Sequence, residues 1–85
     1  MVEEIESKVI GLIADALRMR GLDVHPTLEM SLIDSGILDS LSIVNFVGCL
    51  EKSFGIEIGM SDVTLDNFDN AKLISDLVRA KLSGA

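Results

Sequence analysis

The sequence predicts an all-α fold, a four-helix bundle with three longer helices, one short helix and a long first loop. Apolar residues recur at intervals of three and four in three segments, which is the spacing of helices that bury one face. Glycines and turn residues separate these segments, and no segment has a strand to pair with. Because 85 residues with 48% hydrophobic content suffice for one small core, we expect a single domain over residues 1–85.

The first helix is expected over residues 2–19. Its acidic residues lie near the N-terminus and its arginines near the C-terminus, and both placements complement the helix dipole. Gly21 follows as a stop signal. The residues expected on its buried face are Ile5, Val9, Leu12, Ile13, Ala16 and Leu17.

A loop is expected over residues 21–38, with Pro26 and Gly36 interrupting any helix. We expect one short turn over residues 31–35 and an exposed His25. Five apolar side chains are expected to hold the loop against the bundle: Leu28, Leu32, Ile33, Ile37 and Leu38. Long ordered loops of this kind are often functional.

The second helix is expected to begin at Asp39 or Ser40, since both are good N-caps, and to end at Gly55. Its core face is expected to contain Ile43, Phe46, Val47, Leu50 and Phe54. No charge occurs from Ser40 to Leu50, and the expected outward positions are Ser42, Asn45 and Gly48. Cys49 is expected to be a small core residue.

The remainder of the chain predicts a structured loop at 56–59 and a short helix at 61–65 capped by Ser61. A turn is expected at 66–70, with Phe68 buried beneath it. Its acidic residues lack the spacing of a calcium loop, so we expect no metal site. The last helix is expected over residues 70–82, burying Leu73, Ile74, Leu77 and Val78.

Composition limits the classes of partner. The net charge of −7 would repel nucleic acid and anionic membranes, so we expect neither as a partner. A single cysteine excludes an internal disulfide and fits the cytoplasm, where we expect the protein to be located. No apolar run is long enough to span a bilayer. We also expect the protein to be a monomer.

Ser40 is the candidate for chemistry, since it lies at the start of a helix beside a long loop. A phosphate ester there would meet the positive end of the helix dipole and its free N–H groups. Hydrolysis by Ser40 is not expected, because the sequence has no G-x-S-x-G elbow and its one histidine has no evident orienting partner. We therefore expect no catalytic residue, and a serine that is either modified or simply a helix cap.

The triplet Asp39-Ser40-Leu41, followed by Phe54-Gly55-Ile56-Glu57-Ile58, resembles acyl carrier proteins over nearly the whole chain. That resemblance implies a non-enzymatic carrier with 4′-phosphopantetheine, taken from coenzyme A, attached to Ser40. A phosphopantetheinyl transferase would add the group, and Asp39 and Leu41 would be the flanking residues that the transferase recognises. The thiol of the arm would then hold acyl or aminoacyl groups as thioesters.

Two features are unlike housekeeping fatty-acid carriers. The Ser40 helix is neutral where theirs is often acidic, and two residues separate Gly36 from Asp39 where they usually have one. The leading hypothesis is an acyl carrier for lipid or specialised-metabolite biosynthesis, working with ligase, synthase and acyltransferase enzymes. The alternative is an aminoacyl, D-alanyl or peptidyl carrier loaded by an adenylating ligase. A helical interaction module without the arm would instead tolerate Ser40→Ala.

Overall fold

The computed structural model describes residues 4–84, apart from the side chain of Ser40. Within these residues it contains four α-helices, one 3-10 turn and no strand, which confirms the all-α bundle of three longer helices and a short one. The expected helix start at residue 2 lies outside the described residues. The elements are α1 (Glu4–Met19), α2 (Ser40–Phe54), η1 (Met60–Asp62), α3 (Leu65–Phe68) and α4 (Ala71–Leu82).

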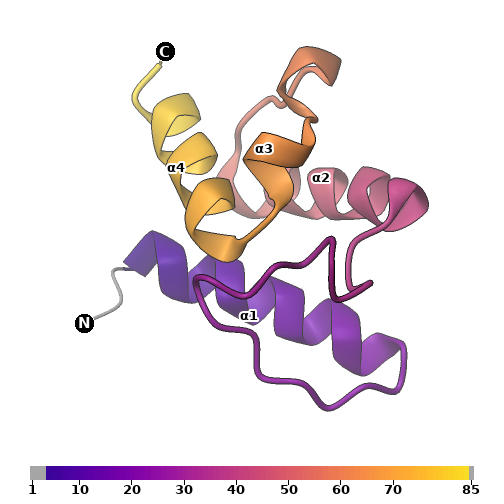
Figure 1. Cartoon of the computed structure of the whole chain (residues 1–85). Helices are drawn as coiled ribbons and strands as arrows, with labels where there is room; N and C mark the ends of the chain where they lie inside the picture. Colours follow the sequence, from indigo (N-terminus) through magenta and orange to yellow (C-terminus); the bar gives the residue numbers. More distant parts are fainter. Residues whose placement is uncertain (1–3, 85) are drawn as a thin grey trace.

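Helix α1 forms the base of the bundle, and both α2 and α4 pack against it (Figure 1). The long loop that follows α1 runs back beside that helix before α2 begins (Figure 1). Buried side chains from all four helices and from the loop form one core, which is mostly aliphatic and includes the fully buried Phe68. No helix within residues 4–84 is both long enough and apolar enough to cross a membrane.

The buried face of α1 is narrower than the sequence predicts. Val9, Ile13 and Leu17 are buried, whereas Ala16 is exposed and the expectation that it faces the core is wrong. Periodicity identifies the direction of an apolar face, but the positions of the neighbouring helices decide how far that face is covered. Ala16 lies at the edge of the face, beside a groove described below.

The loop over residues 20–39 is held by polar contacts as well as by its apolar side chains. Leu32 N donates to the carbonyl oxygen of Asp69 at 2.6 Å, and Lys72 N donates to that of Leu28 at 3.1 Å. Ser31 Oγ also donates to Asp69 Oδ1 at 2.6 Å. Leu32 and Leu38 are buried, and His25 is exposed as predicted. The loop is therefore ordered against the start of α4.

Helix α2 ends where the sequence predicts. Gly55 adopts a left-handed conformation with φ of 66°, and its N–H donates to the carbonyl oxygen of Glu51. The carboxylate of Glu51 accepts from Ile58 N at 2.9 Å, which holds the chain beyond the helix as a loop. Lys8 Nζ contacts this end of α2 by donating to the Ser53 carbonyl oxygen at 3.0 Å.

The short helix is not where the sequence predicts it. A 3-10 turn occupies Met60–Asp62, and α3 begins at Leu65 with Thr64, not Ser61, as its N-cap. Thr64 Oγ1 accepts from Asn67 N at 3.2 Å. Asp62 pairs with Lys81 of α4 at 2.8 Å and accepts from Gly59 N, so tertiary contacts fix the preceding turn separately. Phe68 therefore belongs to α3 rather than to a turn.

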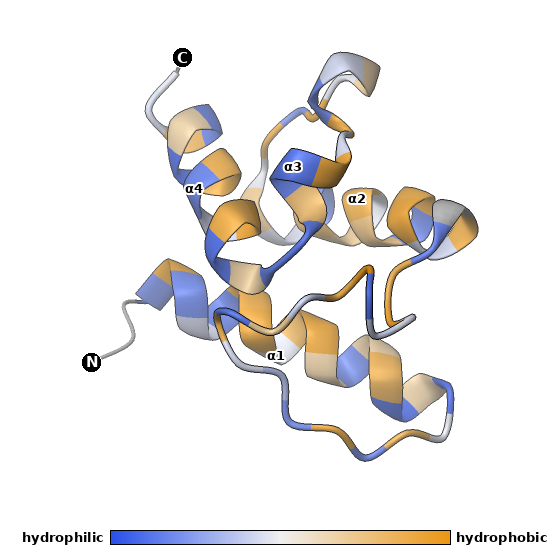
Figure 2. Cartoon of the chain, viewed as in Figure 1, coloured by the Kyte–Doolittle hydropathy of each residue, from blue (hydrophilic) through white to orange (hydrophobic). Residues whose placement is uncertain are grey.

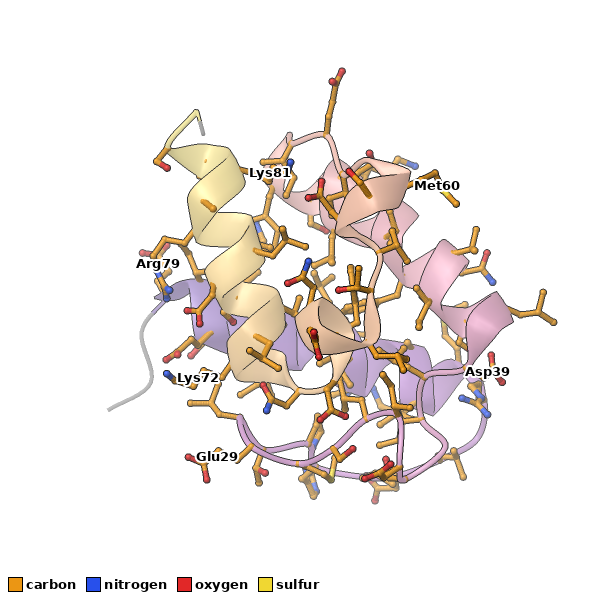
Figure 3. The ribbon with its side chains drawn as sticks, turned by 45° about the horizontal axis from the view of Figure 1, so that its top comes forward. Glu29, Asp39, Met60, Lys72, Arg79 and Lys81 are labelled. Carbon is orange, nitrogen blue, oxygen red and sulfur yellow. The ribbon has the colours of Figure 1, made fainter. Side chains whose placement is uncertain are left out.

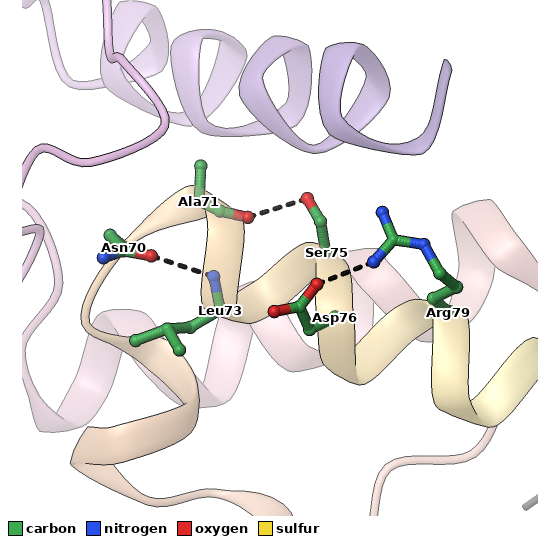
Figure 4. A network of polar contacts seen from close by, with 6 residues as sticks. All are labelled: Asn70, Ala71, Leu73, Ser75, Asp76 and Arg79. Carbon is green, nitrogen blue, oxygen red and sulfur yellow. Dashed lines mark hydrogen bonds and ion pairs between the residues drawn. The ribbon is translucent and has the colours of Figure 1, made fainter. Parts of the chain in front are cut away.

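Helix α4 begins after Asn70, whose side chain accepts from Leu73 N at 2.8 Å (Figure 4). Its buried residues are Ala71, Ile74, Ser75 and Val78. Leu73 and Leu77, which the sequence predicts to be buried, are half-buried. Ile74 and Val78 are buried as predicted, and the small residues Ala71 and Ser75 are buried with them on α4, which packs against α1. Ser75 Oγ donates to the Ala71 carbonyl oxygen at 2.7 Å (Figure 4).

Candidate functional site

The N-terminus of α2 is capped by Asp39. Its backbone is extended, and its Oδ1 accepts from Ser42 N at 2.8 Å and from Leu41 N at 3.1 Å. Hydrogen bonds from Ser42, above all from its backbone N–H, lower the pKa of Asp39 from its usual value. The bond from Leu41 N and the positive charge of Arg20 act in the same direction. Asp39 is therefore an anion whose charge the helix end stabilises.

This geometry decides which of the two candidate caps is used. Asp39 is the N-cap, and Ser40 is the first residue of α2. Ser40 is therefore not the capping residue of α2. The amides of Leu41 and Ser42 already bind the Asp39 carboxylate, so they are not free for a phosphate on Ser40. The helix dipole still favours negative charge at this end of α2.

Arg20 reaches this region from the end of α1. Its guanidinium NH1 donates to the carbonyl oxygen of Ile37 at 3.0 Å, across the loop that leads into α2. Asp39 lies at the edge of the molecule, where this loop meets the helix (Figure 3). The side chains around the start of α2 therefore combine an exposed anion with a nearby cation.

The outer surface of α2 is apolar and uncharged near its start. Leu41 and Val44 are 79% and 65% exposed, and α2 appears mostly apolar in Figure 2. Asn45 and Gly48 are exposed, as predicted. Ser42, which the sequence also predicts to point outward, is half-buried. A side chain at Gly48 would meet no atom within 4 Å, so the glycine is not required by a close contact with another described residue.

Cys49 is exposed, so the expectation that it is a core residue is wrong. The core positions of α2 are Ile43, Phe46 and Leu50, with Val47 and Phe54 half-buried beside them. Cys49 lies next to Leu50 but faces a groove between α1 and α2. Its hydrophobicity alone does not distinguish the two environments.

That groove has a volume of about 310 Å³ and a mostly apolar lining. It lies between the last turns of α1, the end of the long loop and one side of α2. The α1 side contributes Ile13, Ala16, Leu17, Met19 and Arg20, the loop contributes Ile37 and Leu38, and α2 contributes Ser42, Asn45, Phe46 and Cys49.

Residues 7–79 match the sequence family described as "Phosphopantetheine attachment site". The chain belongs to this family. It is similar to D-alanyl carrier protein 1 of Lactiplantibacillus plantarum, with 29% identity over 75 residues that cover 87% of this chain and 90% of that protein. It is also similar to aminoacyl carrier protein 1 of Bradyrhizobium diazoefficiens, with 27% identity over 82 residues that cover 96% and 90% of the two chains.

Family membership gives the protein a role and a cofactor. It is a carrier rather than a catalyst, its cofactor is covalently attached 4′-phosphopantetheine, and carriers of this family work with ligase and synthase enzymes. The described residues fit such a group, because the start of α2 lies at the surface between the exposed residues Asp39 and Leu41. The groove beside it offers apolar walls and one cation, Arg20.

Sequence reasoning placed Asp39, Ser40 and Leu41 together, and α2 begins at this triplet. It missed Arg20, which it treated only as a charge near the end of the first helix. The contact of Arg20 with Ile37 joins residues 17 apart, and no local pattern signals it. The exposed positions of Ala16 and Cys49 on the groove were missed for the same reason, because they depend on how α1 and α2 pack.

Proposed function

We propose that this chain is an aminoacyl carrier whose Ser40 holds the 4′-phosphopantetheine arm. The observation that carries the proposal is the start of α2, where Asp39 is the N-cap and Ser40 is the first residue of the helix. A transferase needs access to this residue from outside, and the exposed neighbours Asp39 and Leu41 provide a surface for it to contact.

The cargo is proposed from two independent features. The relatives described above are named D-alanyl and aminoacyl carriers. Beyond the Asp39 cap, the outer surface near the start of α2 presents the exposed side chains of Leu41 and Val44, so a partner meets apolar rather than ionic contacts at these two residues. An adenylating ligase that binds this surface of α2 would rely on apolar contacts with Leu41 and Val44.

The roles of the residues follow from the geometry. Ser40 provides the oxygen that becomes esterified, and Asp39 fixes the first turn of α2 so that this residue is held at the helix start. Arg20 offsets part of the negative charge that Asp39 and a phosphodiester place close together. When bound, the arm supplies a thiol that holds the cargo as a thioester.

The test of the site is intact mass after incubation with coenzyme A, magnesium and a broad-specificity phosphopantetheinyl transferase. We expect the wild-type chain to gain one phosphopantetheine and Ser40→Ala to gain none. Ser61→Ala is the matched control, because Ser61 is an exposed serine outside α2, and it should gain the group as the wild type does. A mass gain in Ser40→Ala would contradict the assignment.

The test of the cargo uses the loaded carrier. We expect an adenylating ligase with ATP and an amino acid to add an aminoacyl group that hydroxylamine releases, as it does for thioesters. The same carrier should accept no fatty acid from an acyl ligase. Loading with a fatty acid alone would instead support the acyl carrier for lipid or specialised-metabolite biosynthesis.

A further inference from the structure

The peptide group between Ile37 and Leu38 is hydrogen-bonded at both of its polar ends. Arg20 NH1 donates to the carbonyl oxygen of Ile37 at 3.0 Å, and Leu38 N donates to the carbonyl oxygen of Leu32 at 2.9 Å. Because a peptide group is planar, these two bonds together restrict how the whole group can turn. The chain therefore enters α2, which begins at Ser40, from a peptide group that residues outside the helix hold in place.

The backbone of Arg20 is itself fixed at the end of α1. Leu22 N donates to the carbonyl oxygen of Leu17 at 2.9 Å, and Gly21 N donates to that of Arg18 at 2.9 Å, which are the two bonds of a Schellman motif. Gly21 has the left-handed conformation of this motif, with φ of 79°. Arg20 is thus the C-cap residue of α1, and this end of α1 lies on the same side of the molecule as the start of α2 (Figure 1).

The two bonds of the peptide group lie in different surroundings. Leu32 and Leu38 are both buried in the core, so the bond between them belongs to the packed side of the loop. The bond from Arg20 lies on the exposed side. Loss of the Arg20 side chain should therefore leave the core contact in place and loosen the exposed side of the peptide group, directly before the Asp39 cap.

Arg20 also acts on the cap through its charge. Hydrogen bonds from Ser42 are the main reason that the pKa of Asp39 is lowered, and the positive charge of Arg20 adds to their effect. One side chain from α1 therefore both holds the chain before the cap and favours the anionic form of the capping carboxylate.

We propose that Arg20 is a positioning residue for the modification of Ser40. By holding the Ile37 carbonyl oxygen to the end of α1, it fixes the entry of the chain into α2, and with it the place at which Ser40 is presented to a phosphopantetheinyl transferase. The inference rests on the attachment of phosphopantetheine to Ser40. Arg20 acts through the backbone of residues 37–39 and takes no part in the transfer itself.

The first test measures the rate of phosphopantetheinylation by intact mass over a range of carrier concentrations. Arg20→Met keeps a long side chain but has neither charge nor N–H donor. We expect kcat to fall roughly tenfold, as for the loss of a hydrogen bond to a charged group, and KM to change less than about twofold. Arg20→Lys restores a donor and the charge and should recover most of the rate.

The matched control is Arg18→Met. It removes the same charge from an exposed arginine of α1 that pairs with Asp15 rather than with the loop, so it should react as the wild type does. Equal slowing in Arg18→Met would overturn the proposal, and so would a raised KM with unchanged kcat in Arg20→Met, which would make Arg20 a contact of the transferase. Failure of the wild type to gain the group would overturn the assignment of Ser40, whereas equal rates in all variants would overturn the role of Arg20 alone.

The second test uses the unmodified carrier without any transferase. Amide hydrogen exchange, measured by NMR, should become roughly fivefold faster at Leu38 and Ser42 in Arg20→Met, because the peptide group and the cap lose support. Exchange should stay unchanged at Gly55, whose N–H is bonded to Glu51 at the other end of α2. Unchanged exchange at Leu38 and Ser42, or an equal increase at Gly55, would overturn the positioning role.

Discussion

Helices α2 and α4 begin with the same local device but in different surroundings. Asp39 caps α2 and Asn70 caps α4, and each extended cap residue accepts a hydrogen bond of 2.8 Å from a backbone N–H in the first turn. Around Asn70, the neighbouring residues Phe68 and Ala71 are fully buried. Around Asp39, the helix opens onto the surface with Leu41 exposed.

The difference teaches that a cap by itself does not indicate a site. The start of α4 is also joined to the long loop, through the bonds of Asp69 and Lys72 to Leu32 and Leu28, so its cap belongs to the packed interior. The start of α2 is capped by the charged Asp39, whose pKa is lowered, and it has exposed apolar neighbours. The stability of the fold should therefore depend on the start of α4, and recognition by partners on the start of α2.

The largest expected effect comes from removing the side chain beneath the start of α4. Phe68→Ala should lower the free energy of unfolding by about 3–5 kcal/mol, because it empties a fully buried site that the small core cannot refill. Urea denaturation followed by circular dichroism measures this. The control Leu65→Ala, at a residue of the same helix that is 66% exposed, should stay within about 0.5 kcal/mol of the wild type. Similar losses in both variants would refute the argument.

A smaller effect is expected from the cap of α4. Asn70→Ala should lower the free energy of unfolding by about 1 kcal/mol, because Leu73 N loses its acceptor in a half-buried position. Asn70→Ser keeps a capping oxygen and should retain most of the stability. The same denaturation experiment measures both, and equal stability of Asn70→Ala and the wild type would show that the cap of α4 is dispensable.

The cap of α2 should reveal itself through pH. Because the pKa of Asp39 is lowered in the folded chain, its stabilising contribution is present above the usual value of 3.8 and is lost as pH falls through the lowered pKa. Asp39→Asn keeps a good capping residue but has no such titration. The melting temperature, measured at neutral pH and near pH 3, should therefore drop less between these two conditions in Asp39→Asn than in the wild type.

Asp23→Asn, which removes an exposed acid from the loop, is the control for the loss of one negative charge. Acidification should lower its melting temperature about as it does that of the wild type. If Asp39→Asn and Asp23→Asn behaved alike, the pH dependence would come from net charge rather than from the cap.

The smallest effect on stability is expected at Leu41. Leu41→Ala removes a side chain that is 79% exposed, so the free energy of unfolding should change by less than about 0.5 kcal/mol. Its rate of phosphopantetheinylation should nevertheless fall, because a transferase loses an apolar contact beside Ser40. Intact mass over time measures the rate, with Leu82→Ala as an exposed control in α4. Equal rates in the two variants would show that the transferase does not recognise Leu41.

The sequence by itself determined the three longer helices, the Asp39-Ser40-Leu41 start of α2 and its end at Gly55. It also determined the burial of Phe68. These features depend on interactions within a few residues, namely side-chain caps, a left-handed glycine and apolar spacing. That is why a single chain reveals them, and why the family resemblance could be read from the same residues.

Only the tertiary structure decided where α3 begins and which small residues are buried. It also decided the contact of Arg20 with Ile37, 17 residues away, and that of Ser31 with Asp69, 38 residues away. The groove exists because α1 and α2 leave Ala16 and Cys49 uncovered at their edges. Spacing along one helix gives the direction of its apolar face, whereas the limits of that face are set by the elements that pack against it.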